Sequence, residues 1–497
     1  MAEEVEGPRP PHPSRARGEP RDGASPPRLA GSARDPGGGP PPPQPPRAQA
    51  GARDGADRAR GGAREEAAPG RRTRRPQRPD RGGGWTGRQF EVTVGPVAHG
   101  GHCVARHEGR VVFVRHALPG ERAVVRVTED RQPGFCRADA VTVLEPSPER
   151  VQRPCPHSGP GRCGGCDWQH ATPAEQRRLK AAVVREQLAR LAGLDVEVVV
   201  EELPGGPLRW RTRARFAVDR SGAPGLRRHR SHDLVLLDDC PITVEPAARA
   251  VLDRRWPGAG AVDVAVDSVG TVTTTRLDRR GKPQSTRVLR SARPIPGEDA
   301  PAEPAGRTAR HAAGRDWEVE GTGFWQVHPA AADALVAAVG EHAAVRPGET
   351  VLDLYAGAGL FGGALAPAAG ADGRVVCVEA DPAACAAAEA NLAGLPQAEV
   401  WQGEVDAEGL TGLLEELGTA PDVVVLDPPR AGAGPAVSRV LAAAGPRAVV
   451  YVACDPASLA RDVAVFGESG HRLAALRGFD AFPMTSHVEC VALLVPA

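Results

Sequence analysis

The chain has 497 residues with 62 Lys plus Arg and 62 Asp plus Glu, so its formal net charge at pH 7 is zero. This length exceeds one ordinary domain and predicts two to four structural units. A neutral chain gives no general argument for nucleic-acid binding, which must come from local patches. The sequence has no apolar run of about 18 residues and no apolar signal region near its start, so we expect a cytoplasmic protein without a membrane span.

The first 84 residues contain no Phe, Trp, Tyr or Ile, and Pro, Gly and Arg dominate them. Such a segment buries too little apolar surface to offset the entropy lost on ordering. We therefore predict a disordered tail over residues 1–84. Its arginine-rich stretch at 71–81 allows weak contacts with phosphates, and a solubilising tail without a specific role is the alternative.

Residues 85–147 alternate short apolar segments with turns that contain Gly and Pro, which predicts a small β-barrel. The expected strands are Phe90–Val94, Val111–Val114, Ala123–Val127 and Ala140–Leu144. The stretch HGGHCVARHEGRVVFVRHALPGERAVVRV resembles the TRAM domain, a β-barrel module that binds RNA. The resemblance implies an OB-like barrel that binds RNA here, and a barrel that only packs on its neighbours is the alternative.

Residues 148–325 show mixed signals and predict an α+β central domain. A helix is expected over Pro173–Leu191, and the stretch Arg293–Gly314 is expected to be a loop. The expected strands are Val196–Val200, Ala214–Val218, Leu234–Leu237 and Thr271–Thr275.

Four cysteines in this region are candidate metal ligands. Three lie in CPHSGPGRCGGCDWQH, as Cys155, Cys163 and Cys166, and the fourth is Cys240. Ten cysteines in a chain of this length are too few for a disulfide scaffold, so a clustered set indicates metal or catalysis. Four thiolates suit zinc or an iron–sulfur cluster, and unligated thiols are the remaining alternative.

An arginine-rich segment of the same region is a candidate RNA contact. Its alternating arginines are Arg209, Arg211, Arg213 and Arg215, and the same segment continues to Arg227, Arg228 and Arg230. On a strand this spacing places guanidinium groups on one face, where they suit phosphates, and Trp210 and Phe216 are available to stack on bases. A solvated edge strand without a ligand is the alternative.

Residues 326–497 alternate strands and helices, which predicts a doubly wound, Rossmann-like α/β sheet. The expected strands are Thr350–Tyr355, Arg374–Glu379, Val423–Leu426, Ala448–Val452 and Val488–Val495. The expected helices include Pro382–Leu392 and Val437–Ala444. The last strand suits the closing antiparallel strand of class I methyltransferases, although the sequence leaves its direction open.

The segment VLDLYAGAGLFG predicts the cofactor site. Gly357 and Gly359 form a tight turn after a strand, and Glu379 ends the next strand, where a carboxylate accepts hydrogen bonds from ribose hydroxyls. The same glycines fit NAD as well as S-adenosylmethionine. The sequence VVVLDPPR favours S-adenosylmethionine, because it places the carboxylate of Asp427 beside a transferred methyl group. A structural turn is the alternative for this motif.

Two further segments supply a candidate nucleophile and base. YVACDPASLARD places Cys454 between a strand and a helix, where the helix N-terminus favours the thiolate, although such a cysteine alone is more often a packing residue. FPMTSHVECVALL brings Glu489 into an apolar strand, which is costly unless the carboxylate is used. Methylation at carbon 5 of uracil needs both groups, a thiolate to attack carbon 6 and a base to remove the hydrogen on carbon 5.

These segments, with DPPR and GTGFWQVHP, resemble the signatures of the bacterial RNA 5-methyluridine methyltransferase family. The resemblance implies that Cys454 is the nucleophile, Glu489 the base and Asp427 an active-site carboxylate. It implies cofactor contacts from Gln326, Tyr355 and Glu379, a 4Fe–4S cluster on the four cysteines in preference to zinc, and a structured transfer or ribosomal RNA as substrate. No obligate protein partner is evident.

The chain departs from the family pattern at several positions. Ala453 and Asp455 flank the nucleophile where the family commonly has Ser and Asn, and Cys490 replaces a usual Thr. His328 and Leu360 stand where Asn is common, and the first cysteine gap is seven residues in place of five. Three alternatives remain: a nicotinamide-dependent oxidoreductase, a methyltransferase acting on an exocyclic amine of RNA, and a catalytically silent RNA-binding protein.

Overall fold

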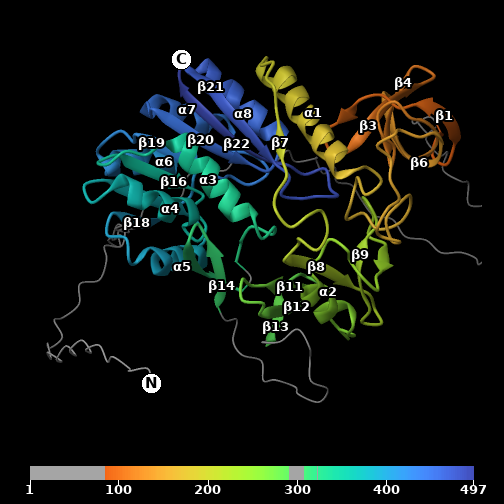
Figure 1. Ribbon diagram of the computed structural model, residues 1–497, viewed down its shortest axis with the longest axis horizontal. Coiled ribbons are helices and arrows are strands. Elements are labelled where there is room, and N and C mark those ends of the chain that lie inside the picture. The colour runs from red at the N-terminus through yellow and green to blue at the C-terminus, as the bar shows by residue number, and fades with distance from the viewer. Residues whose placement is uncertain (1–83, 290–306, 322) are drawn as a thin grey trace, which may run out of the picture. The chain divides into compact units, whose positions relative to one another are not determined.

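The structure, a computed structural model, describes residues 84–289, 307–321 and 323–497. Within this part the strands form two six-stranded sheets, one eight-stranded sheet and a two-stranded hairpin (Figure 1). Apart from Gly84, the predicted disordered tail at 1–84 lies outside the described residues. So does most of the predicted loop Arg293–Gly314.

The first sheet is the predicted barrel region, and each of its four predicted strands is found. Its strands are β1 (Gln89–Thr93), β2 (Val97–Ala98), β3 (His102–His107), β4 (Arg110–Arg115), β5 (Arg122–Gln132) and β6 (Phe135–Glu145). They are ordered β1-β5-β6-β4-β3-β2, and β4 and β6 are the parallel pair. Alternate residues such as Val112, Val114, Ala123 and Val125 are fully buried, as the two-residue period of a strand requires.

Helix α1 (Pro173–Ala192) connects two hydrophobic cores. Leu179 and Val183 pack in the core of the barrel, whereas Val184 and Leu188 pack in the core of the eight-stranded sheet. Residues four apart lie on one helical face, so two adjacent faces of α1 serve the two cores. The helix thereby fixes the barrel against the C-terminal region, a contact that the sequence did not predict.

The second six-stranded sheet forms the centre of the predicted α+β region, and α2 (Glu245–Leu252) packs on it. Its strands, in the order β10-β9-β8-β11-β12-β13, are β8 (Arg213–Val218), β9 (Pro224–Arg227), β10 (Leu234–Leu236), β11 (Ala261–Val266), β12 (Val272–Leu277) and β13 (Pro283–Leu289).

Two expectations for this region are wrong. The predicted loop contains a strand, β14 (Arg307–Ala312), which pairs along its whole length with β15 (Arg315–Glu320). The predicted strand Val196–Val200 is reduced to β7 (Val200–Glu201), whose two residues find ladder partners in the eight-stranded sheet. The pairing partner decides the strand in both cases: the neighbouring strand of a hairpin for β14, and a strand far along the chain for β7.

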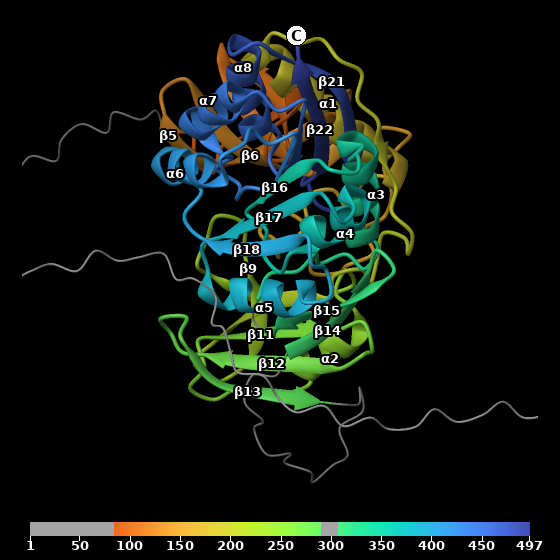
Figure 2. The same cartoon turned by 90° about the vertical axis from the view of Figure 1, so that its left-hand side faces the viewer.

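The eight-stranded sheet has the order β18-β17-β16-β19-β20-β22-β21-β7 (Figure 2). Its C-terminal strands are β16 (Thr350–Leu354), β17 (Arg374–Glu379), β18 (Ala398–Gln402), β19 (Val423–Leu426), β20 (Ala448–Ala453), β21 (His471–Phe479) and β22 (Glu489–Pro496). The helices between and before them are α3 (Ala331–Ala343), α4 (Leu360–Ala369), α5 (Pro382–Leu392), α6 (Ala407–Leu417), α7 (Gly434–Ala444) and α8 (Pro456–Glu468).

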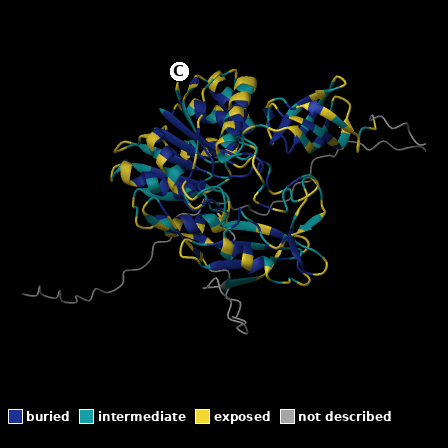
Figure 3. Ribbon diagram, turned by 45° about the vertical axis from the view of Figure 1, so that its right-hand side comes forward, coloured by how far each residue is buried: buried dark blue, intermediate teal, exposed yellow. Residues whose placement is uncertain are grey.

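The topology confirms the Rossmann-like α/β fold. Strands β16 to β20 are parallel, and every residue of β19 and β20 is buried, as in a sheet covered on both faces (Figure 3). β22 runs antiparallel to β20, which settles the direction that the sequence left open. In the described part of the chain, no helix is long and apolar enough to cross a membrane.

Candidate active site

Three side chains meet where neighbouring strands end. Asp427 follows β19, Cys454 follows β20, and Glu489 begins β22. β19 and β22 flank β20 on its two sides. The antiparallel register pairs Ala453 with Cys490, so one step further along this pair Cys454 stands opposite Glu489. The structure therefore brings the predicted nucleophile, base and carboxylate to one edge of the sheet, where ligands of open α/β sheets bind.

Burial raises the pKa of all three groups, and for Cys454 and Glu489 nearby carboxylates add to the shift. Burial, followed by the charges of Glu489 and Asp427, raises the pKa of Cys454 to about 12, and Arg430 acts in the opposite direction. Burial raises the pKa of Asp427 to about 7. Burial and the nearby Asp427 raise the pKa of Glu489 well above its usual value, again opposed by Arg430. Such a site gains most from a ligand that carries positive charge.

The turn after Cys454 is fixed by a capped helix. The Asp455 carboxylate accepts hydrogen bonds from the backbone N–H groups of Ala457 at 3.0 Å and Ser458 at 2.9 Å, at the start of α8. Its other oxygen lies 2.9 Å from Nε2 of His99, which comes from the barrel. Although burial opposes it, hydrogen bonding from His99 and Ser458 lowers the pKa of Asp455 to about 2. This departure from the family pattern is thus an ionised helix cap with a partner.

Two cavities border the same edge of the sheet and share Phe324, Gly357 and Ala358. The smaller, about 40 Å³, is lined by three predicted residues, Gln326, Tyr355 and Asp427. The larger, about 340 Å³, is lined by the predicted Glu379 together with Asp381. A ligand that spans both would place one end beside Asp427 and the other beside Glu379.

The loop between β16 and α4 is shaped by unusual backbone angles. Tyr355 has a φ of 62°, which is rare for a residue with a side chain and typical of functional sites, and Gly357 has a φ of 55°. The Gly357 N–H donates to Glu379 at 2.9 Å. Gly359, with a φ of 84°, lies against Leu392 and lines neither cavity, so its place is in the turn rather than on the ligand surface.

Sequence reasoning missed two residues of this site. Phe324 lines both cavities yet keeps 68% of its surface exposed, which is unusual for a large apolar side chain. Its position two residues before Gln326 was the available signal. Arg430 belongs to the DPPR motif and had no predicted role. Its positive charge lowers the pKa of both Cys454 and Glu489, against the effect of burial.

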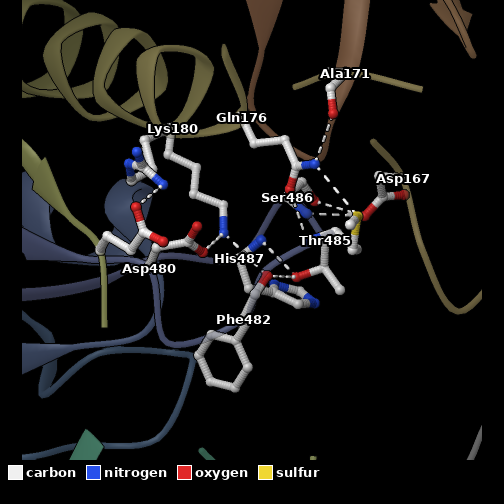
Figure 4. A network of polar contacts seen from close by, with 12 residues as sticks. Asp167, Ala171, Gln176, Lys180, Asp480, Phe482, Thr485, Ser486 and His487 are labelled. Carbon is white, nitrogen blue, oxygen red and sulfur yellow. Dashed lines mark hydrogen bonds and ion pairs between the residues drawn. The ribbon is translucent and has the colours of Figure 1, made fainter. Parts of the chain in front are cut away.

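The loop that leads into Glu489 is tied to α1 by buried polar contacts (Figure 4). Lys180 donates to the Asp480 carboxylate at 2.5 Å and to the Phe482 carbonyl at 3.0 Å, and its side chain is fully buried. Gln176 accepts a hydrogen bond from the Met484 N–H at 2.7 Å. Buried pairs of this kind are costly to break from one side, so they fix the loop.

The same loop is tied to the segment that carries the cysteines. One carboxylate oxygen of Asp167 accepts hydrogen bonds from both the N–H and the hydroxyl of Ser486, each at 3.0 Å (Figure 4). The N–H groups of Asp167 and Trp168 both donate to the Met484 carbonyl at 3.0 Å. The position of the loop before Glu489 therefore depends on the segment next to Cys166.

The four predicted cysteine ligands surround one cavity of about 40 Å³. This cavity is lined by Cys155, Cys163, Cys166 and Cys240. Arg211 also lines it, and the Nε of Arg211 is buried with no hydrogen-bond partner among the described residues. As the side chains stand, the described residues contain no group of three or more His, Cys, Asp or Glu that could hold a metal ion. The structure thus brings the cysteines together, and the metal stays a prediction.

The predicted row of four guanidinium groups on one strand face does not form. Arg209 is in an ion pair with Asp239 at 2.7 Å, and Arg215 in one with Asp263 at 2.6 Å. Arg211 lies over the Trp210 ring at 5.1 Å. Arg213 donates to the Gly323 carbonyl, and Arg209 and Arg211 precede β8, so the four do not share a strand face.

The stacking role suggested for the interleaved aromatics is wrong for the same region. Trp210 is 2% exposed and Phe216 is fully buried. Both belong to the hydrophobic core of the central sheet, where alternate residues of β8 point inward. RNA contacts by the arginines stay a prediction, and they would not include these rings.

Fold and site together define a class I methyltransferase that uses S-adenosylmethionine. Residues 86–141 match the family described as TRAM domain, and residues 322–496 match tRNA (uracil-5-)-methyltransferase. An uncharacterized RNA methyltransferase of Streptomyces coelicolor is 46% identical over 83% of this chain and 93% of its own length. A 23S rRNA (uracil(1939)-C(5))-methyltransferase of Alkalilimnicola ehrlichii is 33% identical over 81% of this chain and 96% of its own.

A solved structure shows the same fold. The Pyrococcus abyssi tRNA (uracil-54, C5)-methyltransferase, in complex with S-adenosyl-L-homocysteine, superimposes with a TM-score of 0.60 at 22% identity, over 82% of this chain and 100% of that one. The chain belongs to the RNA uracil-5-methyltransferase family. It is a methyltransferase that depends on S-adenosylmethionine and acts on carbon 5 of uracil in RNA.

Proposed function

We propose that this enzyme methylates a uridine of transfer or ribosomal RNA through a covalent bond between Cys454 and carbon 6 of the base. The observation that carries the proposal is the position of Cys454 opposite Glu489 across β20 and β22, with Asp427 on the other side of β20. An oxidoreductase or an amine methyltransferase has no use for a thiol and a buried carboxyl group facing each other at this edge.

The chemistry follows from the nucleophile and base that the chain supplies. The Cys454 thiolate forms a bond to carbon 6, and the electron pair of the 5,6 double bond makes carbon 5 nucleophilic. Carbon 5 would take the methyl group as the bond from that methyl to the donor's sulfonium sulfur breaks, and the sulfur would keep the electron pair as a neutral thioether. Glu489 then acts as the carboxylate and accepts the proton from carbon 5. The bond between the Cys454 sulfur and carbon 6 breaks, and the double bond returns. The departing Cys454 is left as the thiolate, ready for the next base.

Ionisation of Cys454 needs help, because its pKa in the free protein lies near 12. The N-terminus of α8 and the positive charge of Arg430 both favour the thiolate. A bound cation beside Asp427 would offset the carboxylate charges that oppose it. We therefore expect the nucleophile to be activated in the complex with cofactor and RNA rather than in the free protein.

S-adenosylmethionine supplies the methyl group from a positively charged sulfonium. We assign Asp427, Gln326 and Tyr355 to its sulfonium and amino-acid end, because they line the smaller cavity. We assign Glu379 to its ribose, because that carboxylate lines the larger cavity. Gly357 borders both, where a side chain would crowd the ligand, and Gly359 shapes the turn that presents them.

The residues around the cysteine cavity fit a 4Fe–4S cluster. Four cysteines line one cavity, as such a cluster needs. The orphaned Nε of Arg211 would offset the negative charge of four thiolates around iron and sulfide. The cluster would be structural. It would hold the segment that contains Asp167, and Asp167 contacts the loop before Glu489. Zinc is the alternative that metal analysis distinguishes.

The wider assignments rest on the same family membership. We infer a cytoplasmic enzyme with an RNA-binding barrel at 85–147, a cysteine-bearing central region at 148–325 and a catalytic region at 326–497. The curated relatives include rRNA enzymes, and the solved neighbour is a tRNA enzyme. Mapping the methyl group lost from the RNA of a deletion strain would decide between these substrates.

Trapping on RNA that contains 5-fluorouridine tests the proposal. Glu489 cannot remove fluorine as a proton, so an adduct with Cys454 should persist on denaturing gels. Cys454→Ala should abolish it, whereas Cys136→Ala, which removes a buried barrel cysteine, should not. On ordinary RNA, Glu489→Gln should accumulate the methylated adduct and slow product release. An adduct that survives Cys454→Ala would refute the assignment.

A further inference from the structure

A fourth cavity, larger than the three described above, lies between the barrel and the cysteine-bearing region. Its volume is about 460 Å³, and strands β3 to β6, the turn around Arg162 and the turn at residues 228–233 line it. It adjoins neither cofactor cavity, and the predicted row Arg209–Arg215 contributes nothing to it.

The cavity carries an excess of positive charge. Its arginines are Arg115, Arg131, Arg137, Arg162, Arg228 and Arg230, and its acidic residues are Glu129, Asp130, Asp139 and Asp233. Six arginines against four acidic groups leave two positive charges in excess.

The acidic groups neutralise these arginines incompletely. The single carboxylate of Glu129 is shared by Arg131 at 3.8 Å, Arg137 at 3.6 Å and Arg230 at 3.7 Å, and all three distances are long for ion pairs. Arg162 donates to the Pro156 carbonyl, which leaves its charge in place. Guanidinium groups in this state suit a phosphate that offers several oxygens at once.

Two histidines add groups of a different kind. His102 is 8% exposed, and the Nε2 atoms of both His102 and His229 are buried with no hydrogen-bond partner among the described residues. Burial, followed by nearby charges that include Arg115, lowers the pKa of each to about 4, so both rings are neutral at pH 7. The rings lie 5.8 Å apart at 64°, and Phe113 lies 6.2 Å from His102. A neutral ring nitrogen suits the edge of a base, and the ring faces suit stacking.

We infer that this cavity binds an unstacked nucleotide of the substrate RNA, next to the uridine that reacts at Cys454. The arginines receive its phosphates, and His102 and His229 receive its base. The inference rests on the proposed function, because it takes the ligand to be the RNA that is methylated.

The barrel loop brings the cavity close to the nucleophile. His99 contacts Asp455, the residue after Cys454, and His102 of the cavity follows three residues later. Three residues span at most about 11 Å of chain. Gly101, with a φ of 79°, lies so near the loop before Glu489 that a Cβ on Gly101 would come within 2.7 Å of Ser486 Cβ. A base at Cys454 and a base in the cavity can therefore belong to one short stretch of RNA.

Binding of fluorescein-labelled single-stranded RNA, followed by anisotropy over a series of salt concentrations, tests this inference. The test variant is Arg131→Ala with Arg230→Ala, since the two side chains are 84% and 51% exposed and should not disturb folding. The matched control is Arg249→Ala with Arg255→Ala, on exposed arginines outside the cavity.

The test pair should weaken RNA binding roughly tenfold or more and reduce the slope of log Kd against log salt by about 0.7 per arginine. His229→Ala should weaken binding without changing that slope, because the ring is neutral. RNA that contains 4-thiouridine should form photocrosslinks on the peptide with His229. Cofactor binding should stay unchanged in all variants.

The outcomes separate this inference from the proposed function. If the test pair binds RNA like the control pair while the 5-fluorouridine adduct with Cys454 still forms, the cavity is not an RNA site and the proposed function stands. If the adduct never forms but the test pair loses affinity and slope, the proposed function fails and the cavity remains an RNA-binding site.

Discussion

The Asp427 carboxyl group predicts that the enzyme distinguishes S-adenosylmethionine from its demethylated product by pH. Burial raises the pKa of Asp427 to about 7, whereas its ordinary value is 3.8. The group lines the smaller cofactor cavity. A positively charged sulfonium binds best to the ionised carboxylate, and S-adenosylhomocysteine, which has lost that charge, gains nothing from it.

The magnitude follows from the fraction ionised. One pH unit below 7, only about a tenth of Asp427 is ionised, so affinity for S-adenosylmethionine should fall roughly tenfold for each further unit. Affinity for S-adenosylhomocysteine should change little over the same range. Asp427→Asn should weaken S-adenosylmethionine binding roughly 10- to 100-fold at about pH 8, as expected for losing a hydrogen bond to a charged group, and should remove the pH dependence.

Isothermal titration calorimetry in buffers of different ionisation enthalpy measures both the affinity for the cofactor and the number of protons released on binding. Binding of S-adenosylmethionine near pH 6.5 should release up to one proton in the native enzyme and none in Asp427→Asn. Glu489→Gln is the matched control, because Glu489 lines neither cofactor cavity and its loss should leave the proton release of Asp427 in place. Equal pH dependence for the two ligands in the native enzyme would refute the reasoning.

Stability provides the folding control for this variant. The folded pKa of Asp427 exceeds its ordinary value of 3.8, so the stability that this group contributes is complete below pH 3.8 and is lost as the pH rises through about 7. Above pH 7 the native protein keeps a buried charge at a cost. Asp427→Asn should therefore unfold at the same or a higher temperature than the native protein at about pH 8.

Three further predictions concern the elements around the site. Lys180→Met should lower the free energy of urea unfolding by about 3–5 kcal/mol, because it leaves Asp480 buried and unpaired, and adding Asp480→Asn should recover most of the loss. Near pH 6, His99→Ala should lower the free energy of unfolding by less than about 1 kcal/mol, and near pH 9 it should have no effect. The reason is that pairing with Asp455 raises the pKa of His99, and the benefit disappears once the ring is neutral. Protein purified without oxygen should be brown with about four iron and four sulfide, and Cys166→Ala should lose the colour; stoichiometric zinc without iron would contradict the cluster.

The class of enzyme could be predicted from the amino-acid sequence, because the relevant signals are local. Cys454 before a helix, Asp427 in Asp-Pro-Pro and Glu489 entering an apolar strand each lie within a few residues of a strand end. The parallel strands of a doubly wound sheet all present their carboxyl ends to one edge, so such local positions predict a common site. The same regularity made β17 and α5 predictable to the residue.

Features that depend on partners far away in the chain became visible in the folded protein and could not be predicted from local sequence. The alternation of arginines around Arg213 predicted one face, but Asp239 and Asp263 and the core around Trp210 engage these side chains differently. The cavity of His102 and His229 joins residues more than a hundred positions apart, and neither residue signals it locally. Spacing along the chain specifies which way a side chain points on its own strand or helix, whereas long-range packing decides what it meets there.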